Sequence, residues 1–131
     1  MVASTANGAK VLLVEDSLDT LTITTRLLRL SGLEVTPCST AEDAEVELSE
    51  ADQRPSRFQL MISDWNLERQ NAALLVEHAC RLGIPVLVVT GRPHQVNEWL
   101  DESASPAVKE CGVRVVAKGN DWLPVVHNLM Q

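Results

Sequence analysis

Five polar residues with chemical capability each lie at or just after the end of an apolar run, namely Glu15, Asp16, Asp64, Thr90 and Lys118. Taken singly, each has an ordinary structural reading, since an aspartate after a strand usually caps a turn and a lone lysine is usually solvated. Brought together, the three carboxylates would repel one another, and a bound divalent cation relieves that repulsion. Mg²⁺ suits such a set because it takes few protein carboxylates and keeps waters that phosphate oxygens can replace.

The same residues could carry out phosphoryl transfer. Asp64 is a weakly basic nucleophile, which suits a loose transition state where positioning and charge neutralisation supply most of the catalysis. Lys118 would place a cation against the phosphoryl oxygens, and Thr90 would offer a hydroxyl donor. Because Gly91 has no side chain, it leaves room for a phosphoryl group and a backbone N–H to approach each other. Together these residue types indicate a site that accepts a phosphoryl group.

The elements that must position these residues are visible as apolar runs that alternate with helical patterns. The runs are predicted to be strands, and they cover Lys10–Glu15, Leu33–Cys38, Phe58–Ser63, Ile84–Thr90 and Val113–Lys118. Strict alternation of strand and helix predicts a parallel sheet with helices on both faces. Ligands bind such sheets at the carboxyl ends of the strands, which is where the polar residues fall.

Helix boundaries are marked by capping and proline signals. The predicted starts are a capping box at Thr40–Asp43, an Asn71 cap, Pro93 in a first turn, and Ser105-Pro106 before a second short helix. The first helix is expected to place one side inward, made of Leu18, Leu21, Thr25 and Leu28, with Leu27 beside them. The last helix is expected from about Asn120 to the end, interrupted by Pro124.

Length and charge limit the number of domains and the classes of partner. The 131 residues suit one domain, and the formal net charge of -7 argues against direct binding to nucleic acid or an anionic membrane. Three cysteines without a CxxC pair do not form a disulfide framework, so we expect a reducing cytoplasm, with Cys38 and Cys80 filling the core. No signal peptide or membrane span is visible, and Met1–Ala9 is expected to be a flexible leader.

Four segments resemble the strands of response-regulator receiver domains from two-component signalling and phosphorelays. They are Val11–Ser17, Met61–Leu67, Val88–Gly91 and Val115–Lys118. The resemblance runs from about Lys10 to Met130, so residues 10–131 are expected to form the receiver domain. It implies a CheY-like α/β fold: a flavodoxin-like, doubly wound five-stranded parallel sheet of order 2-1-3-4-5 with helices on both faces.

The resemblance also implies roles for individual residues. Asp64 resembles the phosphoacceptor; Asp16 resembles a direct Mg²⁺ ligand, and Glu15 a ligand that acts through water. Mg²⁺ would also contact Asp64 and the backbone carbonyl of Asn66, while Thr90 and Lys118 resemble the switch hydroxyl and the phosphate-binding lysine. The implied function is a phosphorylation-dependent switch that takes its phosphoryl group from a histidine kinase or histidine phosphotransfer protein and changes binding to a downstream protein. Such a chain is no enzyme beyond its own phosphoryl transfer and dephosphorylation.

The sequence departs from the receiver pattern at several places. Gly119 stands where a proline usually follows the lysine, and Val115 replaces the usual Tyr or Phe. The loop after the acceptor has Glu68 and Ala72 in place of a proline and a glycine, and the stretch Thr90–Lys118 is longer than usual. These departures leave open a pseudo-receiver that binds a partner constitutively as a scaffold.

Two other functions fit the sequence less well. A phosphatase with an aspartate nucleophile needs a second acid two residues later, where this chain has Asn66; a flavin site needs a phosphate-cradling loop after the first strand, which is missing. His78, His94 and His127 are scattered over helical regions and are not expected to bind zinc or carry phosphate. Trp65 is interpreted either as a core residue or as one that shapes access to Asp64. The stretch 122–126 is interpreted as the packed face of the last helix.

Overall fold

The computed structural model describes residues 8–51 and 58–130. A single parallel sheet runs through it in the order β2-β1-β3-β4-β5. Its strands are β1 (Lys10–Val14), β2 (Glu34–Cys38), β3 (Leu60–Asp64), β4 (Val86–Thr90) and β5 (Arg114–Ala117). This is the strand order that the resemblance implied, and the expected doubly wound fold is confirmed.

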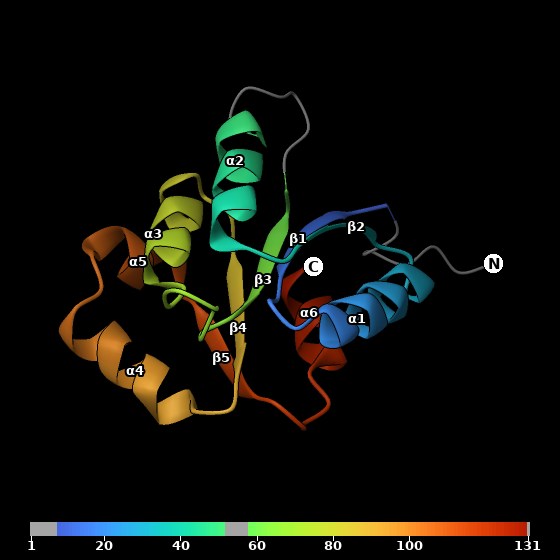
Figure 1. Ribbon diagram of the computed structural model, residues 1–131. Helices are drawn as coiled ribbons and strands as arrows, with labels where there is room; N and C mark the ends of the chain where they lie inside the picture. Colours follow the sequence, from blue (N-terminus) through green and yellow to red (C-terminus); the bar gives the residue numbers. More distant parts are fainter. Residues whose placement is uncertain (1–7, 52–57, 131) are drawn as a thin grey trace.

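Helices cover both faces of the sheet (Figure 1). On one face lie α1 (Leu18–Leu30) and α6 (Leu123–Leu129). The other face carries α2 (Ala41–Ala51), α3 (Ala73–Arg81), α4 (Pro93–Glu102) and α5 (Pro106–Cys111). Because each sheet face is covered, the buried apolar side chains form two core layers, one on each side.

Alternation along β1 shows how the sequence builds both layers. Val11 and Leu13 pack toward α1 and α6, whereas Leu12 and Val14 pack in the layer that contains α2 and α3. Strands β3 and β4 are buried along their whole lengths, as expected for central strands covered on both faces. The apolar runs were therefore sufficient to predict the sheet.

The predicted helix starts are largely confirmed. Thr40 Oγ1 accepts a hydrogen bond from Asp43 N at 3.1 Å, and Ser105 Oγ accepts from Val108 N at 3.4 Å. The N-cap of α3 is Ala72 rather than the predicted Asn71, although Asn71 Oδ1 accepts from Ala73 N at 2.9 Å. Pro93 lies in the first turn of α4. These bonds satisfy backbone N–H groups that have no partner inside a first helical turn.

The inward side of α1 is narrower than predicted. Thr25 and Leu28 are buried, but Leu18 is 66% exposed and Leu27 is 45% exposed. Leu18 is the first residue of the helix and lies beyond the end of β1, so no strand lies beneath it. Leu27 lies about 100° around the helix from Leu28, which turns it toward solvent.

The last helix begins later than predicted, at Leu123 rather than near Asn120. The residues before it form a turn, in which Gly119 has a φ of 91° and Asp121 Oδ1 accepts from Leu123 N at 3.3 Å. Pro124 therefore lies in the first helical turn and does not interrupt the helix, because an N–H is not needed there.

Strand β2 forms one edge of the sheet, and its outer side is protected. Glu34 and Cys38 use their backbone groups toward β1, so Val35 and Pro37 direct theirs outward. Pro37 has no N–H, and the Arg29 guanidinium donates to the carbonyl oxygen of Val35 at 3.2 Å. The outer backbone of β2 therefore lacks one donor and has one acceptor already bonded, so its ladder of groups is interrupted.

Of the expected leader, residues 1–7 lie outside the described part of the chain. Gly8 N donates to Gly32 O at 2.7 Å, and Ala9 is buried beside Glu34, whose N donates to Ala9 O. Cys38 and Cys80 are buried, as predicted. Within residues 8–51 and 58–130, no helix combines the length and apolar character needed to cross a membrane.

Candidate functional site

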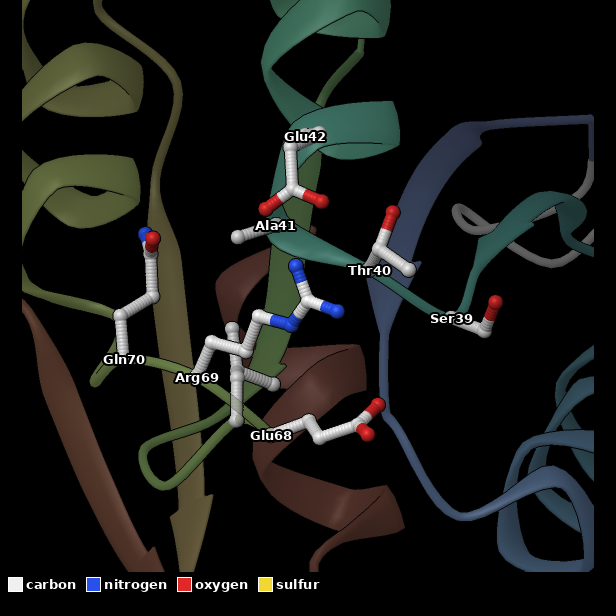
Figure 2. A pocket seen from close by; sticks show the side chains of 8 residues that line it. Ser39, Thr40, Ala41, Glu42, Glu68, Arg69 and Gln70 are labelled. Atoms are coloured by element: carbon white, nitrogen blue, oxygen red, sulfur yellow. The ribbon is translucent and has the colours of Figure 1, made fainter.

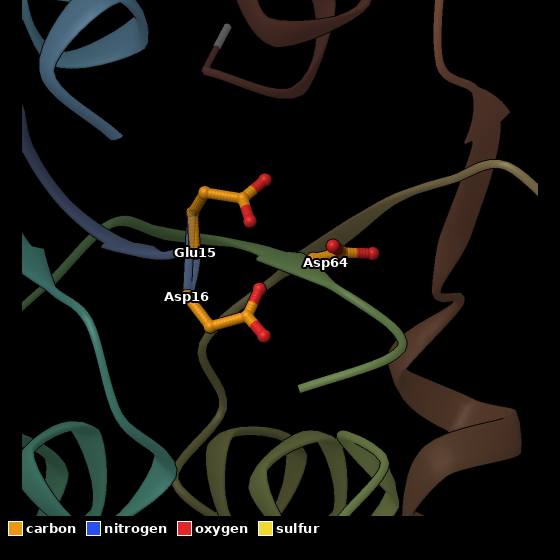
Figure 3. A group of neighbouring side chains, drawn as sticks. All are labelled: Glu15, Asp16 and Asp64. Carbon is orange, nitrogen blue, oxygen red and sulfur yellow. The ribbon is translucent and has the colours of Figure 1, made fainter. Parts of the chain in front are cut away.

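The carboxyl ends of β1 and β3 bring three acidic side chains together. Glu15 and Asp16 directly follow β1, and Asp64 is the last residue of β3. The two strands are neighbours, with Val14 opposite Ser63, so both end at the same edge of the sheet. Figure 3 shows Glu15 and Asp16 extending to different sides of the β1 end, with Asp64 beside them.

The three carboxylates form a compact set of oxygen donors. One oxygen from each of Glu15, Asp16 and Asp64 lies within 4.8 Å of the other two. Glu15 and Asp64 are buried, and Asp16 is half-buried. Hard oxygen donors at this spacing fit Mg²⁺, which would offset the repulsion among the carboxylates.

Lys118 adds one positive charge to the group. It directly follows β5, and its backbone N donates to Thr90 O at 2.8 Å. Its Nζ donates to Asp64 Oδ2 at 2.9 Å and lies 3.5 Å from Glu15 Oε1. One lysine cannot neutralise three carboxylates, so the set retains negative charge for a further cation.

The pKa values of these groups reflect the crowding. Burial raises the pKa of Glu15, and the nearby charge of Asp64 adds to this effect, while a hydrogen bond from the Ser17 N–H and the charge of Lys118 oppose it. For Lys118, burial lowers the pKa, but the hydrogen bond and charge of Asp64 outweigh burial, so the pKa rises. The lysine is therefore firmly cationic, whereas ionisation of Glu15 is disfavoured.

Thr90 is the last residue of β4 and is fully buried. Val89, its neighbour, pairs with Asp64, so the threonine lies one residue beyond Asp64 along the adjacent strand. Its Oγ1 accepts a hydrogen bond from Arg92 N at 3.1 Å, which forms the turn into α4. A Cβ atom added to Gly91 would have no neighbouring heavy atom within 4 Å, so the space next to this residue is open.

The loop after Asp64 is ordered by its own backbone. Leu67 N donates to Gln70 O at 2.9 Å, and Ala72 N donates to Trp65 O at 2.8 Å. Asn66, the expected carbonyl ligand, is exposed at the start of this loop and forms a backbone bridge with Asn71. The loop keeps a defined shape without the proline and glycine that receivers usually have.

A pocket of about 170 Å³ separates this loop from the start of α2. Figure 2 shows the Arg69 side chain extending from the loop toward Glu42 at the beginning of α2, with Glu68 on the other side. The pocket therefore mixes one cation with two carboxylates. It lies next to the loop that follows Asp64, but it contains none of the predicted site residues.

Sequence reasoning missed a second cavity, of about 220 Å³, on the α1 and α6 side of Asp64. Glu15, Asp64 and Lys118 line it together with Thr20, Thr24 and Trp122. The sequence predicts Trp122 only as part of a packed helix face. Its separation from Lys118, four positions along the chain, does not indicate that the two line one cavity.

Trp65 is a core residue. It is 3% exposed, and its ring centroid lies 5.0 Å from that of Trp99, with an interplanar angle of 51°. His78, one of the three scattered histidines, contacts the Glu45 carboxylate between α3 and α2. The contact between Trp65 and Trp99 packs α4 against the segment that contains Asp64.

Comparison with known proteins shows which fold this is. No protein-family model matches the sequence, and no curated protein matches it. Among solved structures, a response regulator receiver protein from Sinorhizobium medicae WSM419 has a TM-score of 0.73 at 16% identity, with 94% of each chain covered. The chemotaxis response regulator CheY4 of Vibrio cholerae has a TM-score of 0.72 at 21% identity, covering 94% of this chain and 99% of its own.

A third structure is the response regulator TrrA from Thermotoga maritima, in complex with Mg²⁺ and BeF. It has a TM-score of 0.70 at 12% identity, covering 92% of this chain and 96% of its own. Each of these similarities extends over nearly the whole chain, and all three are to proteins of one class. The chain therefore has the fold of CheY-like response-regulator receiver domains.

Proposed function

We propose that this chain is a phosphorylation-dependent signalling receiver whose acceptor is Asp64. The observation that carries the proposal is the group of Asp64, Lys118, Glu15 and Asp16 at the carboxyl edge of a receiver-type sheet. An aspartate that is hydrogen-bonded to a lysine and lies within 4.8 Å of two further carboxylates fits a nucleophile beside a metal site. The phosphoryl donor would be the phosphohistidine of a sensor kinase or phosphotransfer protein.

Each residue has a defined task in the transfer. Asp64 Oδ2 accepts the hydrogen bond of Lys118, which leaves Oδ1 as the attacking atom. The new bond joins Oδ1 to phosphorus as the phosphorus–nitrogen bond of the donor histidine breaks, and the imidazole nitrogen leaves. Lys118 neutralises charge on the phosphoryl oxygens, and the Thr90 hydroxyl, which accepts from Arg92 N, keeps its own hydrogen to donate to one of them.

Glu15, Asp16, Asp64 and the carbonyl of Asn66 are the groups that would hold Mg²⁺. When bound, Mg²⁺ supplies positive charge that offsets the developing charge on the phosphoryl oxygens. The chain would then act only on its own phosphoryl group, in the cytoplasm, by transfer and later hydrolysis. Its net charge of -7 favours protein partners over nucleic acid or an anionic membrane.

The signal would leave through Arg92–Gly112. This segment starts two residues after Thr90 and contains α4 and α5, whose buried residues are only Val96 and Val108. Val115 has few rotamers and cannot move between buried and exposed positions as an aromatic ring does. Displacement of a weakly packed segment is an established way to read a phosphoryl group.

A second candidate, a scaffold that binds its partner without phosphorylation, is favoured by one observation. Val115 packs against the core, and Gly119 with its φ of 91° shapes the turn after Lys118 in place of the usual proline. Both changes lie where receivers couple the acceptor to the partner face.

The test is intact-mass analysis after incubation with acetyl phosphate and Mg²⁺. Wild type should gain the mass of one phosphoryl group, and EDTA should prevent the gain. Asp64→Asn should gain nothing, whereas Asp101→Asn, a matched change of an exposed aspartate on α4, should behave as wild type. Labelling of Asp64→Asn at the wild-type level would refute the acceptor assignment. Absence of labelling in wild type would favour the scaffold.

A further inference from the structure

Two cysteines face each other where α3 and α5 pack together. Cys80 is the next-to-last residue of α3, and Cys111 is the last residue of α5. Figure 1 shows the two helices side by side at the edge of the α/β stack. Near the start of α5, Ser105 Oγ and Ser105 N both donate to the Glu77 carboxylate of α3, so the helices are held at both ends.

The two thiols share one environment. Both line an open hollow of about 450 Å³, so small solutes can reach them. Cys111 Sγ donates to Ile84 O at 3.5 Å, and the thiols of Cys80 and Cys111 lie close enough for each to shift the pKa of the other. Cys80 is 7% exposed and Cys111 is half-buried, which makes Cys111 the more accessible of the pair.

The contact makes the two thiols unequal. The hydrogen bond from Cys80 lowers the pKa of Cys111, against the effect of burial. The same hydrogen bond raises the pKa of Cys80, and burial and the nearby charges of Cys111 and Glu77 add to it. Because the thiolate is the reactive form of cysteine, Cys111 is the first target of an oxidant.

We propose that Cys80 and Cys111 form a peroxide-sensitive pair that closes to a disulfide between α3 and α5. The Cys111 thiolate attacks one oxygen of hydrogen peroxide, the O–O bond breaks, and the second oxygen leaves as water after taking a proton. Cys111 is then a sulfenic acid. The Cys80 sulfur attacks the Cys111 sulfur, and the sulfenic oxygen leaves as a second water with the Cys80 proton. Two thiols are oxidised, and one peroxide is reduced to two waters.

Oxidation of Cys111 also activates its partner. The negative charge of Cys111 is one of the causes that raise the pKa of Cys80, and that charge is gone once Cys111 is a neutral sulfenic acid. The second step therefore becomes easier after the first. The product joins residues 80 and 111 covalently and holds α5 against α3. In a reducing compartment such a bond is transient, which suits a sensor.

Cys38 is a built-in control. It is 5% exposed at the end of β2, and burial with the nearby charges of Glu47 and Asp43 raises its pKa to about 11. It should therefore stay reduced while the pair reacts. Its position on β2, away from α3 and α5, excludes it from the same disulfide (Figure 1).

The experiment treats the folded wild-type chain with hydrogen peroxide, then labels the remaining thiols with a maleimide under denaturing conditions. We expect loss of two of the three labels, a Cys80–Cys111 linked peptide, and full recovery of labelling after dithiothreitol. Cys80→Ser should leave Cys111 as a sulfenic acid that reacts with dimedone. Cys111→Ser should lose no label under the same conditions.

Three outcomes would overturn the proposal. One is retention of all three labels in wild type. Another is a linked peptide that contains Cys38. The last is irreversible oxidation of Cys111 in wild type without a link to Cys80, because that result would mean the two sulfurs do not meet. Since wild type itself gives the answer, poor folding of either variant would not affect the test.

Discussion

Replacing Glu15 by glutamine should stabilise the metal-free protein at neutral pH. Burial and the charge of Asp64 raise the pKa of Glu15, so the folded chain holds this proton at pH values where the unfolded chain, with the ordinary value of 4.5, has lost it. Unfolding therefore releases a proton in this range. Stability must fall as the pH rises from 4.5 through the folded-state pKa, and above that pKa the penalty is complete.

The size of the effect follows from the charges around Glu15. Asp16 and Asp64 each have an oxygen within 4.8 Å, and each repels a charged Glu15 by about 1 kcal/mol even at a water-like dielectric. Lys118, 3.5 Å away and 44% exposed, attracts it by about 1 kcal/mol and cancels one of these repulsions. Glutamine keeps an oxygen for the Ser17 N–H, which now lies 3.1 Å from Glu15 Oε2. A net gain of about 1 kcal/mol is expected.

Urea unfolding of wild type and Glu15→Gln in EDTA, between pH 4 and pH 8, measures this directly. Wild type should lose stability across that range relative to the variant. With saturating Mg²⁺ the difference should shrink or reverse, because a ligand bound only to the folded state adds to its stability and the variant has lost one of the binding groups. Glu102→Gln, an exposed change on α4, is the control for a general charge effect. Equal pH dependence in the two proteins would refute the account of Glu15.

Three further predictions concern other parts of the chain. Thr25 is 7% exposed, and its Oγ1 has no hydrogen-bond partner within the described residues, so Thr25→Val should raise the free energy of unfolding by about 1 kcal/mol in urea; a decrease would mean that the hydroxyl is satisfied in solution. Gly119 has a φ of 91°, so Gly119→Ala should cost about 1 kcal/mol or more, while Gly91→Ala, in open space without a positive φ, should cost less; equal losses would contradict this reasoning. Beryllofluoride with Mg²⁺ should change amide hydrogen exchange chiefly in Arg92–Gly112, and Thr90→Ala should abolish the change; the same exchange with and without the mimic would favour the scaffold.

The sheet and the acidic group could be predicted from the sequence because both depend on local patterns and one topological rule. Five apolar runs separated by helical stretches require a parallel sheet, and parallel strands place Glu15, Asp64 and Lys118 at one edge. The strand order came from the resemblance, since periodicity alone does not rank neighbours. The contact between Asp64 and Lys118 joins residues 54 positions apart and follows directly from that order.

What could not be predicted depends on packing between elements. The outward side of α1 carries Ile23, Leu27 and Leu30, all exposed, so apolar residues surround much of the helix and do not mark its buried side. The cysteine pair and the Trp65–Trp99 contact join elements whose relative placement no local pattern encodes. The start of α6 was misjudged because the turn at Gly119 uses residues whose types also occur in a first helical turn.

The protected edge at β2 limits how this molecule can meet other chains. Strand addition extends a sheet by pairing free N–H and C=O groups along an edge, and it underlies both peptide capture and the stacking of chains into fibrils. At β2, Pro37 removes one donor and Arg29 occupies one acceptor, so an incoming strand would find an interrupted ladder. A partner that approaches from this side has to recognise side chains rather than backbone. The same arrangement disfavours backbone pairing of this edge between two copies of the chain.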